Sequence, residues 1–269
     1  MQDLKVALIQ AELVWEDPVA NLERFYERIA RISEDVHLIV LPEMFSTGFS
    51  MQPAGLAQPM DGPAVAWMQE RAHEFQADIA GSLMVEEQGR FYNRLVWARP
   101  DGSIAVYDKK HLFRYAGEDK VYTAGNQHLT VICQGWKIRP FVCYDLRFPI
   151  WTRNIDSAYD AAIFVANWPE RRAPHWKALL KARAIENQCY VVGVNRVGID
   201  GKGYRYSGES RIIDPQGRIV DSRSHAEAIL TGVFSVAILE DYRRTFPAWM
   251  DADGEMVAGR TPAGGQRNK

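Results

Sequence analysis

The chain has 269 residues, of which 47% are hydrophobic, and this size suits one large α/β domain with a substantial core. Its 32 Lys and Arg nearly balance its 34 Asp and Glu, which gives a net charge of −2. That balance excludes a broad electrostatic attraction to nucleic acid or to an anionic membrane, so we expect a small-molecule partner.

The first elements form a predicted β-α-β unit. Residues 4–10 and 37–41 have the apolar character of strands, and Asp17-Pro18 between them supplies an N-cap followed by proline at the first helical position. The following residues recur at helical spacing and are expected to form one buried face: Val19, Leu22, Phe25, Ile29 and Ile32.

The alternation of helix and strand then continues along the chain. Helices are predicted at residues 63–75 and 174–188, and strands at residues 78–85, 91–98, 103–107, 141–143, 161–166 and 191–194. After Val197, strands joined by tight glycine turns are expected to run to about Leu239 and complete the sheets. Two sheets with outer helices fit this order. We expect one domain over residues 1–253, with residues 254–269 as a flexible tail or a subunit contact.

The cysteine, histidine and glycine patterns indicate the cellular compartment of the protein and whether it needs a metal or a cofactor. Three cysteines without a CxxC pair speak against a disulfide framework, and neither a signal peptide nor a membrane-spanning segment is expected, so the cytoplasm is favoured. The six histidines form no zinc motif, and no phosphate loop or dinucleotide motif occurs. We therefore expect neither a metal nor a cofactor.

Three residues lie at or just beyond the ends of predicted strands, where α/β sheets usually bind their ligands. Glu43 follows the predicted strand 37–41, Lys109 follows the strand 103–107, and Cys143 ends an apolar run before a turn whose backbone N–H groups could face an oxyanion. Taken singly, each has a more ordinary explanation. An acid in a loop is usually a cap, a lysine pair is usually solvated, and a strand cysteine usually only packs.

The strings around these residues are LPEMF, YDKKHLF and CYDLRFP, in this order. Together they resemble the signatures of the nitrilase superfamily of carbon–nitrogen hydrolases, and the match covers nearly the whole chain. The family's Lys-x-His-Leu pattern selects Lys109 rather than Lys110. The resemblance implies a four-layer α-β-β-α sandwich, a homodimer, and Glu43, Lys109 and Cys143 as catalytic residues.

Further residues follow from the same resemblance. Glu118 stands where the family has a second glutamate, although the usual Pro-Gly after it is Ala124-Gly125 here, and we expect it to hold Glu43 or Lys109 in position. The backbone N–H of Tyr144 and the ammonium of Lys109 are the implied oxyanion donors. A purely structural role for Glu118 is the alternative.

The stretch from Val165 to Gly198, with ANWP, HWKALLKARAIENQ and YVVGVNRVG, most resembles the ω-amidase branch, which hydrolyses 2-oxoglutaramate to 2-oxoglutarate and ammonia. A substrate carboxylate needs a cation, which Arg171 or Arg172 could supply, while Phe49 and Trp168 could wall the pocket. A solvent-facing arginine pair is the alternative. Other open functions are another branch of the family, such as a nitrilase or a carbamoyl-amine hydrolase, and a binding protein without turnover.

Overall fold

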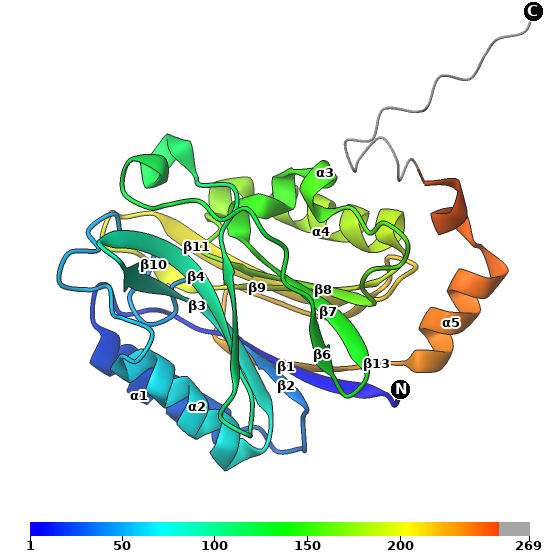
Figure 1. The fold of residues 1–269 in the computed structure, drawn as a ribbon, viewed down its shortest axis with the longest axis horizontal. Coiled ribbons are helices and arrows are strands. Elements are labelled where there is room, and N and C mark those ends of the chain that lie inside the picture. Colours follow the sequence, from blue (N-terminus) through cyan, green and yellow to red (C-terminus); the bar gives the residue numbers. More distant parts are fainter. Residues whose placement is uncertain (253–269) are drawn as a thin grey trace, which may run out of the picture.

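The computed structural model describes residues 1–252, and the tail expected at residues 254–269 lies outside this range. Two β-sheets face each other with helices on their outer sides (Figure 1). The first sheet has the order β13-β1-β2-β3-β4-β5. Its strands are β1 (Leu4–Gln10), β2 (Leu38–Val40), β3 (Asp78–Glu87), β4 (Arg90–Ala98), β5 (Ile104–Asp108) and β13 (Ala228–Phe234).

The second sheet has the order β10-β11-β9-β8-β7-β6, with β12 also paired to β11. Its strands are β6 (Val131–Cys133), β7 (Trp136–Val142), β8 (Ala161–Ala166), β9 (Tyr190–Asn195), β10 (Val197–Ile199), β11 (Arg205–Ile213) and β12 (Ile219–Ser224). Strands β7, β8 and β9 run parallel, as do β1, β2 and β3. The carboxyl ends of these strands therefore carry the loops that can form a site.

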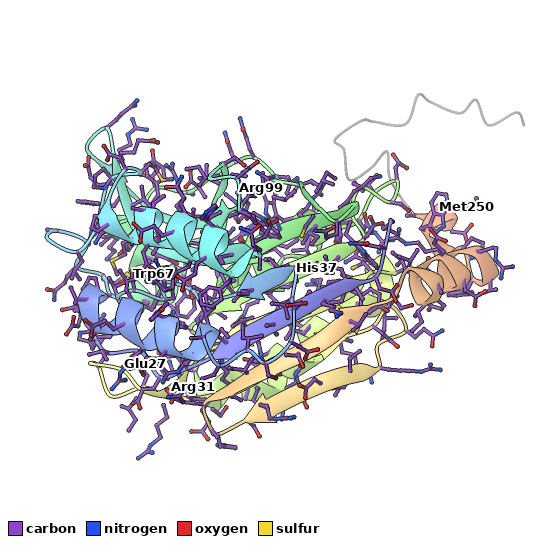
Figure 2. The ribbon with its side chains drawn as sticks, turned by 90° about the horizontal axis from the view of Figure 1, so that it is seen from below. Glu27, Arg31, His37, Trp67, Arg99 and Met250 are labelled. Carbon is purple, nitrogen blue, oxygen red and sulfur yellow. The ribbon has the colours of Figure 1, made fainter. Side chains whose placement is uncertain are left out.

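Helices cover both outer faces. Helices α1 (Pro18–Ile29) and α2 (Pro63–Phe75) lie side by side on the first sheet (Figures 1 and 2), where Phe25, Met68 and Ile79 share one apolar cluster. Helices α3 (Pro149–Thr152) and α4 (Ala173–Asn187) lie on the second sheet. A larger cluster fills the space between the sheets. The predicted four-layer α-β-β-α sandwich is confirmed.

Helix α1 begins as predicted but ends earlier. The Asp17 side chain accepts a hydrogen bond from the Ala20 N–H (3.1 Å), and Pro18 occupies the first turn. The predicted burial of Val19 is wrong, because this side chain is 67% exposed. Two residues later, Asn21 is buried instead, and its amide donates to the carbonyl groups of Val14, Asp17 and Ser46. Ile32 follows the helix and packs only at its edge.

The largest differences from the predicted strand bounds lie before Cys143 and near Leu239. The strand before Cys143 begins at Trp136 and ends at Val142, so Cys143 opens a short 3₁₀ turn, η3 (Cys143–Arg147). The strands predicted to reach Leu239 end at Phe234, and helix α5 (Val236–Thr245) follows. Val236 and the buried Leu239 lie three residues apart and pack on the core from one helical face. The remaining 3₁₀ turns are η1 (Arg114–Ala116), η2 (Glu118–Lys120), η4 (Glu170–Arg172) and η5 (Ala248–Asp251).

Candidate active site

Loops from both sheets meet at one end of the sandwich. Glu43 lies three residues after β2, Cys143 directly follows β7, and Asn167 directly follows β8. Lys109 comes directly after β5 at the edge of the first sheet, and Glu118 begins η2. The fold thus brings together five residues that are up to 124 positions apart in the sequence.

A buried ion cluster forms the floor of the site. The Lys109 ammonium donates to Glu43 Oε1 (2.8 Å) and to Glu118 Oε1 and Oε2 (3.0 and 2.9 Å). The Asn93 amide donates to Glu43 Oε1 (2.8 Å) and Glu118 Oε1 (3.0 Å). All four side chains are buried. Glu118 therefore meets Glu43 through Lys109 and Asn93.

The second oxygen of Glu43 is held from the opposite sheet. The backbone N–H of Asn167 donates to Glu43 Oε2 (2.8 Å), and the Asn167 amide donates to the Glu43 carbonyl (2.5 Å). A carboxylate fixed at both oxygens is a rigid proton acceptor, which suits a general base. The loop after β8 thus fixes the orientation of a residue that follows β2.

The charges in the cluster depend on one another. Burial alone would lower the pKa of Lys109, but the negative charges of Glu118 and Glu43 outweigh it, so the pKa is raised and the ammonium stays charged. Burial raises the pKa of Glu118 against the opposing charge of Lys109. Lys109 is thus a fixed positive charge at the floor of the site.

Cys143 has an unusual backbone conformation. Its φ is +44°, in the left-handed region that few residues other than glycine adopt, and such strain is typical of functional sites. Burial raises the pKa of the thiol well above its usual value, and the negative charge of Glu43 raises it further, while Lys109 opposes this shift. The resting sulfur is therefore a neutral thiol, and its use as a nucleophile requires a base beside it.

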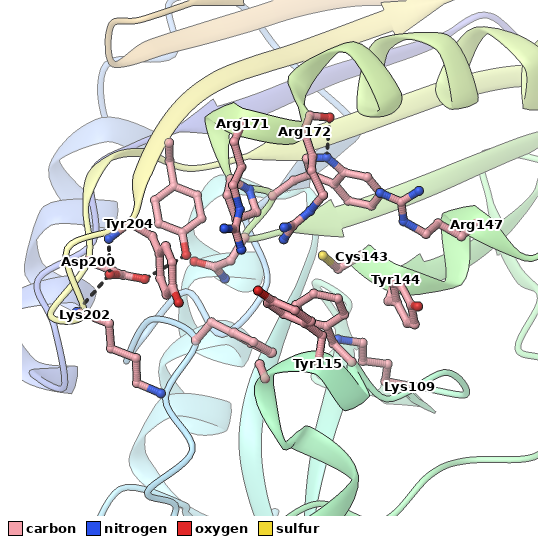
Figure 3. A pocket seen from close by; sticks show the side chains of 17 residues that line it. Lys109, Tyr115, Cys143, Tyr144, Arg147, Arg171, Arg172, Asp200, Lys202 and Tyr204 are labelled. Carbon is pink, nitrogen blue, oxygen red and sulfur yellow. Dashed lines mark hydrogen bonds between the residues drawn. The ribbon is translucent and has the colours of Figure 1, made fainter.

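A pocket of about 260 Å³ opens above Cys143 and Lys109 (Figure 3). All residues that the sequence suggested for substrate contact lie in its wall, together with Tyr144: Phe49, Trp168, Arg171 and Arg172. The Lys109 nitrogen lies 5.1 Å from the centre of the Phe49 ring. The predicted site residues thus lie in one place, either in this wall or, for Glu43 and Glu118, in the cluster that surrounds Lys109.

Arginines give the pocket its positive charge. Arg172 is half-buried against the Phe113 ring, whereas Arg171 is exposed between Tyr115 and Tyr204 at the mouth. Burial lowers the pKa of Arg172, and the charge of Arg171 lowers it further. Among residues 1–252, neither arginine has a carboxylate partner within salt-bridge distance. An anionic ligand would therefore relieve an unbalanced charge.

The sequence analysis missed several residues of the site. Asn167 follows the apolar run of β8, the same signal that pointed to Glu43, so the pattern could have identified it. Arg147 also lines the pocket, over the Trp168 ring at 4.7 Å. Asn93 had no such signal, because its role depends on contacts between distant segments.

Residues 1–252 contain neither a membrane-spanning helix nor a cluster of metal ligands. No helix in this range is long and apolar enough to cross a membrane. No group of three or more His, Cys, Asp or Glu side chains within it could hold a metal ion.

Known proteins resemble this chain over most of its length. Omega-amidase YafV of Escherichia coli K12 is 48% identical over 255 residues, covering 94% of this chain and 98% of that protein. The 2-oxoglutaramate amidase of Bacillus subtilis is 31% identical and covers 91% and 96%.

Solved structures and a family model agree with these relatives. The crystal structure of XC1258 from Xanthomonas campestris, a CN-hydrolase superfamily protein, matches with a TM-score of 0.92 and 42% identity, covering 94% of this chain and 98% of that one. Saccharomyces cerevisiae Nit3, of the nitrilase superfamily, matches with a TM-score of 0.83 and 27% identity, covering 91% and 95%. The carbon–nitrogen hydrolase model matches residues 5–244. With this fold and this cluster, the chain belongs to the carbon–nitrogen hydrolase family.

Proposed function

We propose that this protein is an ω-amidase that hydrolyses 2-oxoglutaramate to 2-oxoglutarate and ammonia through a thioester on Cys143. The observation that carries the proposal is a buried Glu43–Lys109 pair beneath a pocket that holds Cys143. The same pocket holds Arg171 and Arg172, which have no carboxylate partner within residues 1–252. The name of the Escherichia coli relative supports the ω-amidase class, and the name of the Bacillus subtilis relative supports the substrate.

The first half-reaction forms the thioester. Glu43 takes the proton of the Cys143 thiol as the sulfur attacks the amide carbon, and a carbon–sulfur bond forms. Glu43 then gives this proton to the amide nitrogen, the carbon–nitrogen bond breaks, and ammonia leaves. In the second half-reaction Glu43 removes a proton from water, whose oxygen attacks the thioester. The carboxylic acid leaves and the thiol recovers its proton.

The oxyanion of each tetrahedral intermediate needs fixed donors. Lys109 and the backbone N–H of Tyr144 fill this role in the proposal, and loss of one such donor typically costs about 3 kcal/mol of barrier. Lys109 is well suited because Glu43 and Glu118 hold its nitrogen in place. Its contacts to the two oxygens of Glu118 can share one N–H, which leaves one of the three ammonium donors for the oxyanion. Glu118 acts here as a positioning residue for Lys109.

The far end of the substrate is a carboxylate, and Arg172 is its best partner. A charge-assisted hydrogen bond gains strength in a desolvated pocket, and Arg172 is half-buried whereas Arg171 is exposed. Arg171 lies between two tyrosine rings at the mouth, where it can attract the anion from solution.

Arg172→Ala is expected to lower kcat/KM for 2-oxoglutaramate by roughly 10- to 100-fold, because a charge-assisted hydrogen bond contributes about 1.5–3 kcal/mol. The same variant should barely change the rate for an analogue whose carboxylate is capped as an ester. Arg171→Ala is the matched control and should have the smaller effect. The measurement is ammonia release across 2-oxoglutaramate, succinamate and the ester.

The same assay tests the alternatives. If both arginine variants keep the wild-type ratio of acid to ester, the arginines do not bind the carboxylate, although the ω-amidase proposal survives. An enzyme that prefers the ester, or that turns over a nitrile or a carbamoyl amine faster, is another member of the family. If no substrate releases ammonia, the protein is a binding protein without turnover.

We also propose that the protein is a cytoplasmic homodimer. Its three cysteines are all free, which fits a reducing compartment. Ile238, Phe246 and Met250, in and after α5, are exposed apolar side chains that association could cover. Light scattering would measure the mass of the particle, and a monomer at working concentration would contradict the dimer.

A further inference from the structure

One buried carboxylate outside the ion cluster joins the two catalytic segments. Asp145 lies two residues after Cys143 in η3, and its side chain is fully buried. It is not part of the pocket wall. Nothing in the proposed reaction uses its charge, so its burial needs another explanation.

Asp145 accepts four hydrogen bonds. Oδ2 accepts from the Val142 N–H (3.1 Å) and the Tyr107 hydroxyl (2.7 Å). Oδ1 accepts from the His111 backbone N–H (2.9 Å) and from His111 Nδ1 (2.8 Å). A carboxylate only accepts, so Nδ1 of His111 carries the proton. These four donors compensate the burial of the charge.

The positions of these donors reveal what the carboxylate holds. Val142 immediately precedes Cys143, whereas Tyr107 and His111 stand two residues before and two residues after Lys109. Asp145 therefore links the turn that begins at Cys143, which follows the second sheet, to the residues on both sides of Lys109, which follows the first sheet.

The surroundings make the arrangement rigid. The His111 ring stacks on Phe148 at 3.8 Å, and the Trp151 indole donates to the Tyr107 hydroxyl (3.0 Å). Burial, with the charge of Asp145, raises the pKa of Tyr107 well above its usual value, so the phenol remains a donor. Cys143 also needs support, because its backbone is in the left-handed region.

We infer that Asp145 is a positioning residue that fixes the Cys143 sulfur and the Lys109 ammonium relative to each other for amide attack. The inference rests on the proposed function, since it assumes Cys143 as nucleophile and Lys109 as oxyanion donor. Asp145 touches neither the substrate nor the sulfur in this role. It acts through the segments that its two oxygens join.

Asp145→Asn tests the inference with almost no change in shape. In either amide orientation one former oxygen becomes an NH₂ group facing two donors, so the link between the segments opens. A misplacement of about 1 Å can cost roughly 100-fold in rate, and kcat should fall by about this factor. KM should stay within roughly threefold of wild type, because the pocket arginines are unaffected.

The rate at which iodoacetamide alkylates Cys143 distinguishes a loss of alignment between Cys143 and Lys109 from a general disruption of the site. This reaction displaces iodide at a saturated carbon and forms no oxyanion, so it needs Cys143 and Glu43 but not the alignment of Lys109. Glu43 is held by Asn93, Lys109 and Asn167, and Asp145 contacts none of these. Asp145→Asn should therefore keep its alkylation rate within roughly tenfold of wild type while turnover falls further.

Asp160→Asn is the matched control. Asp160 is also a buried carboxylate, but it accepts from the Lys137 N–H (3.0 Å) and Arg243 (2.7 Å), away from the pocket. This variant should lose thermal stability and keep kcat. Equal kcat values in the two variants, or equal falls in turnover and alkylation for Asp145→Asn, would overturn the inference.

Two milder variants cover the case in which Asp145→Asn does not fold. Tyr107→Phe and His111→Gln each weaken one of the four hydrogen bonds, and each should lower kcat by roughly three- to tenfold at unchanged KM. Wild-type kcat in both would contradict the inference. Full activity in Cys143→Ala would instead contradict the proposed function, so the two failures can be told apart.

Discussion

Replacement of Cys143 by alanine is expected to abolish amide hydrolysis while the fold remains intact. A methyl group cannot attack the amide, and removal of a nucleophile typically lowers kcat by about four to six orders of magnitude. The change in volume is small, and the pocket side of the residue leaves room for it. Ammonia release, with circular dichroism as the folding check, measures both parts of the expectation.

Covalent labelling provides the control for this variant. Cys143 faces the pocket, whereas Cys133 and Cys189 are buried in the core, and burial raises the pKa of both core thiols. Iodoacetamide should therefore label Cys143 first, in step with the loss of activity, and intact-mass analysis of wild type with substrate should show one acyl adduct. Loss of activity with label on Cys133 or Cys189 and none on Cys143 would refute the assignment.

Elements of the fold could be predicted where the spacing of apolar residues and the residues that begin or end an element indicated the same structure. Asp17-Pro18 marked the start of α1, and the apolar run of β8 marked a buried strand. The end of the last strand could not be predicted. Val236 and Leu239 fit a strand by composition, but in the structure they lie on one face of helix α5, which packs on the core.

Some residues of the site could likewise be predicted from the sequence, and others could not. Glu43, Lys109 and Cys143 each come directly after or close to the end of a strand, which is a local feature that the sequence carries. Asn93 lies inside β4, and nothing local distinguishes it from any other polar residue of a strand. Its importance arises because β4 lies beside β5 and thereby brings the amide to both Glu43 and Glu118.

The same contrast explains why the choice between Arg171 and Arg172 stayed open. The two residues are adjacent in the sequence and identical in chemistry. Their difference arises in the short turn η4, which directs one guanidinium onto the half-buried Phe113 and the other onto the exposed Tyr115. A turn of three residues thus places two adjacent side chains in different environments. The spacing of apolar residues in the sequence does not show which of the two arginines is half-buried.

Lys109→Ala is expected to lower turnover by at least two to three orders of magnitude, because the oxyanion loses a donor that contributes about 3 kcal/mol. The fold should also suffer. Glu43 and Glu118 would remain buried without their shared cation, and breaking a buried pair of this kind costs roughly 3–5 kcal/mol of stability. Steady-state kinetics and thermal unfolding together measure the two effects.

Lys110→Ala is the matched control in the neighbouring position. The Lys110 ammonium lies 5.3 Å from the centre of the Trp151 ring and contacts neither Glu43 nor Glu118. Its loss should cost only about 0.5–1 kcal/mol of stability and leave kcat near wild type.

If Lys109→Ala is too unstable to assay, Lys109→Met combined with Glu118→Gln removes the cation and one of the two charges it balances. Equal losses of activity in the folded Lys109 and Lys110 variants would show that the Lys-x-His pattern has been assigned to the wrong lysine, and a fully active Lys109 variant would remove the lysine from the mechanism.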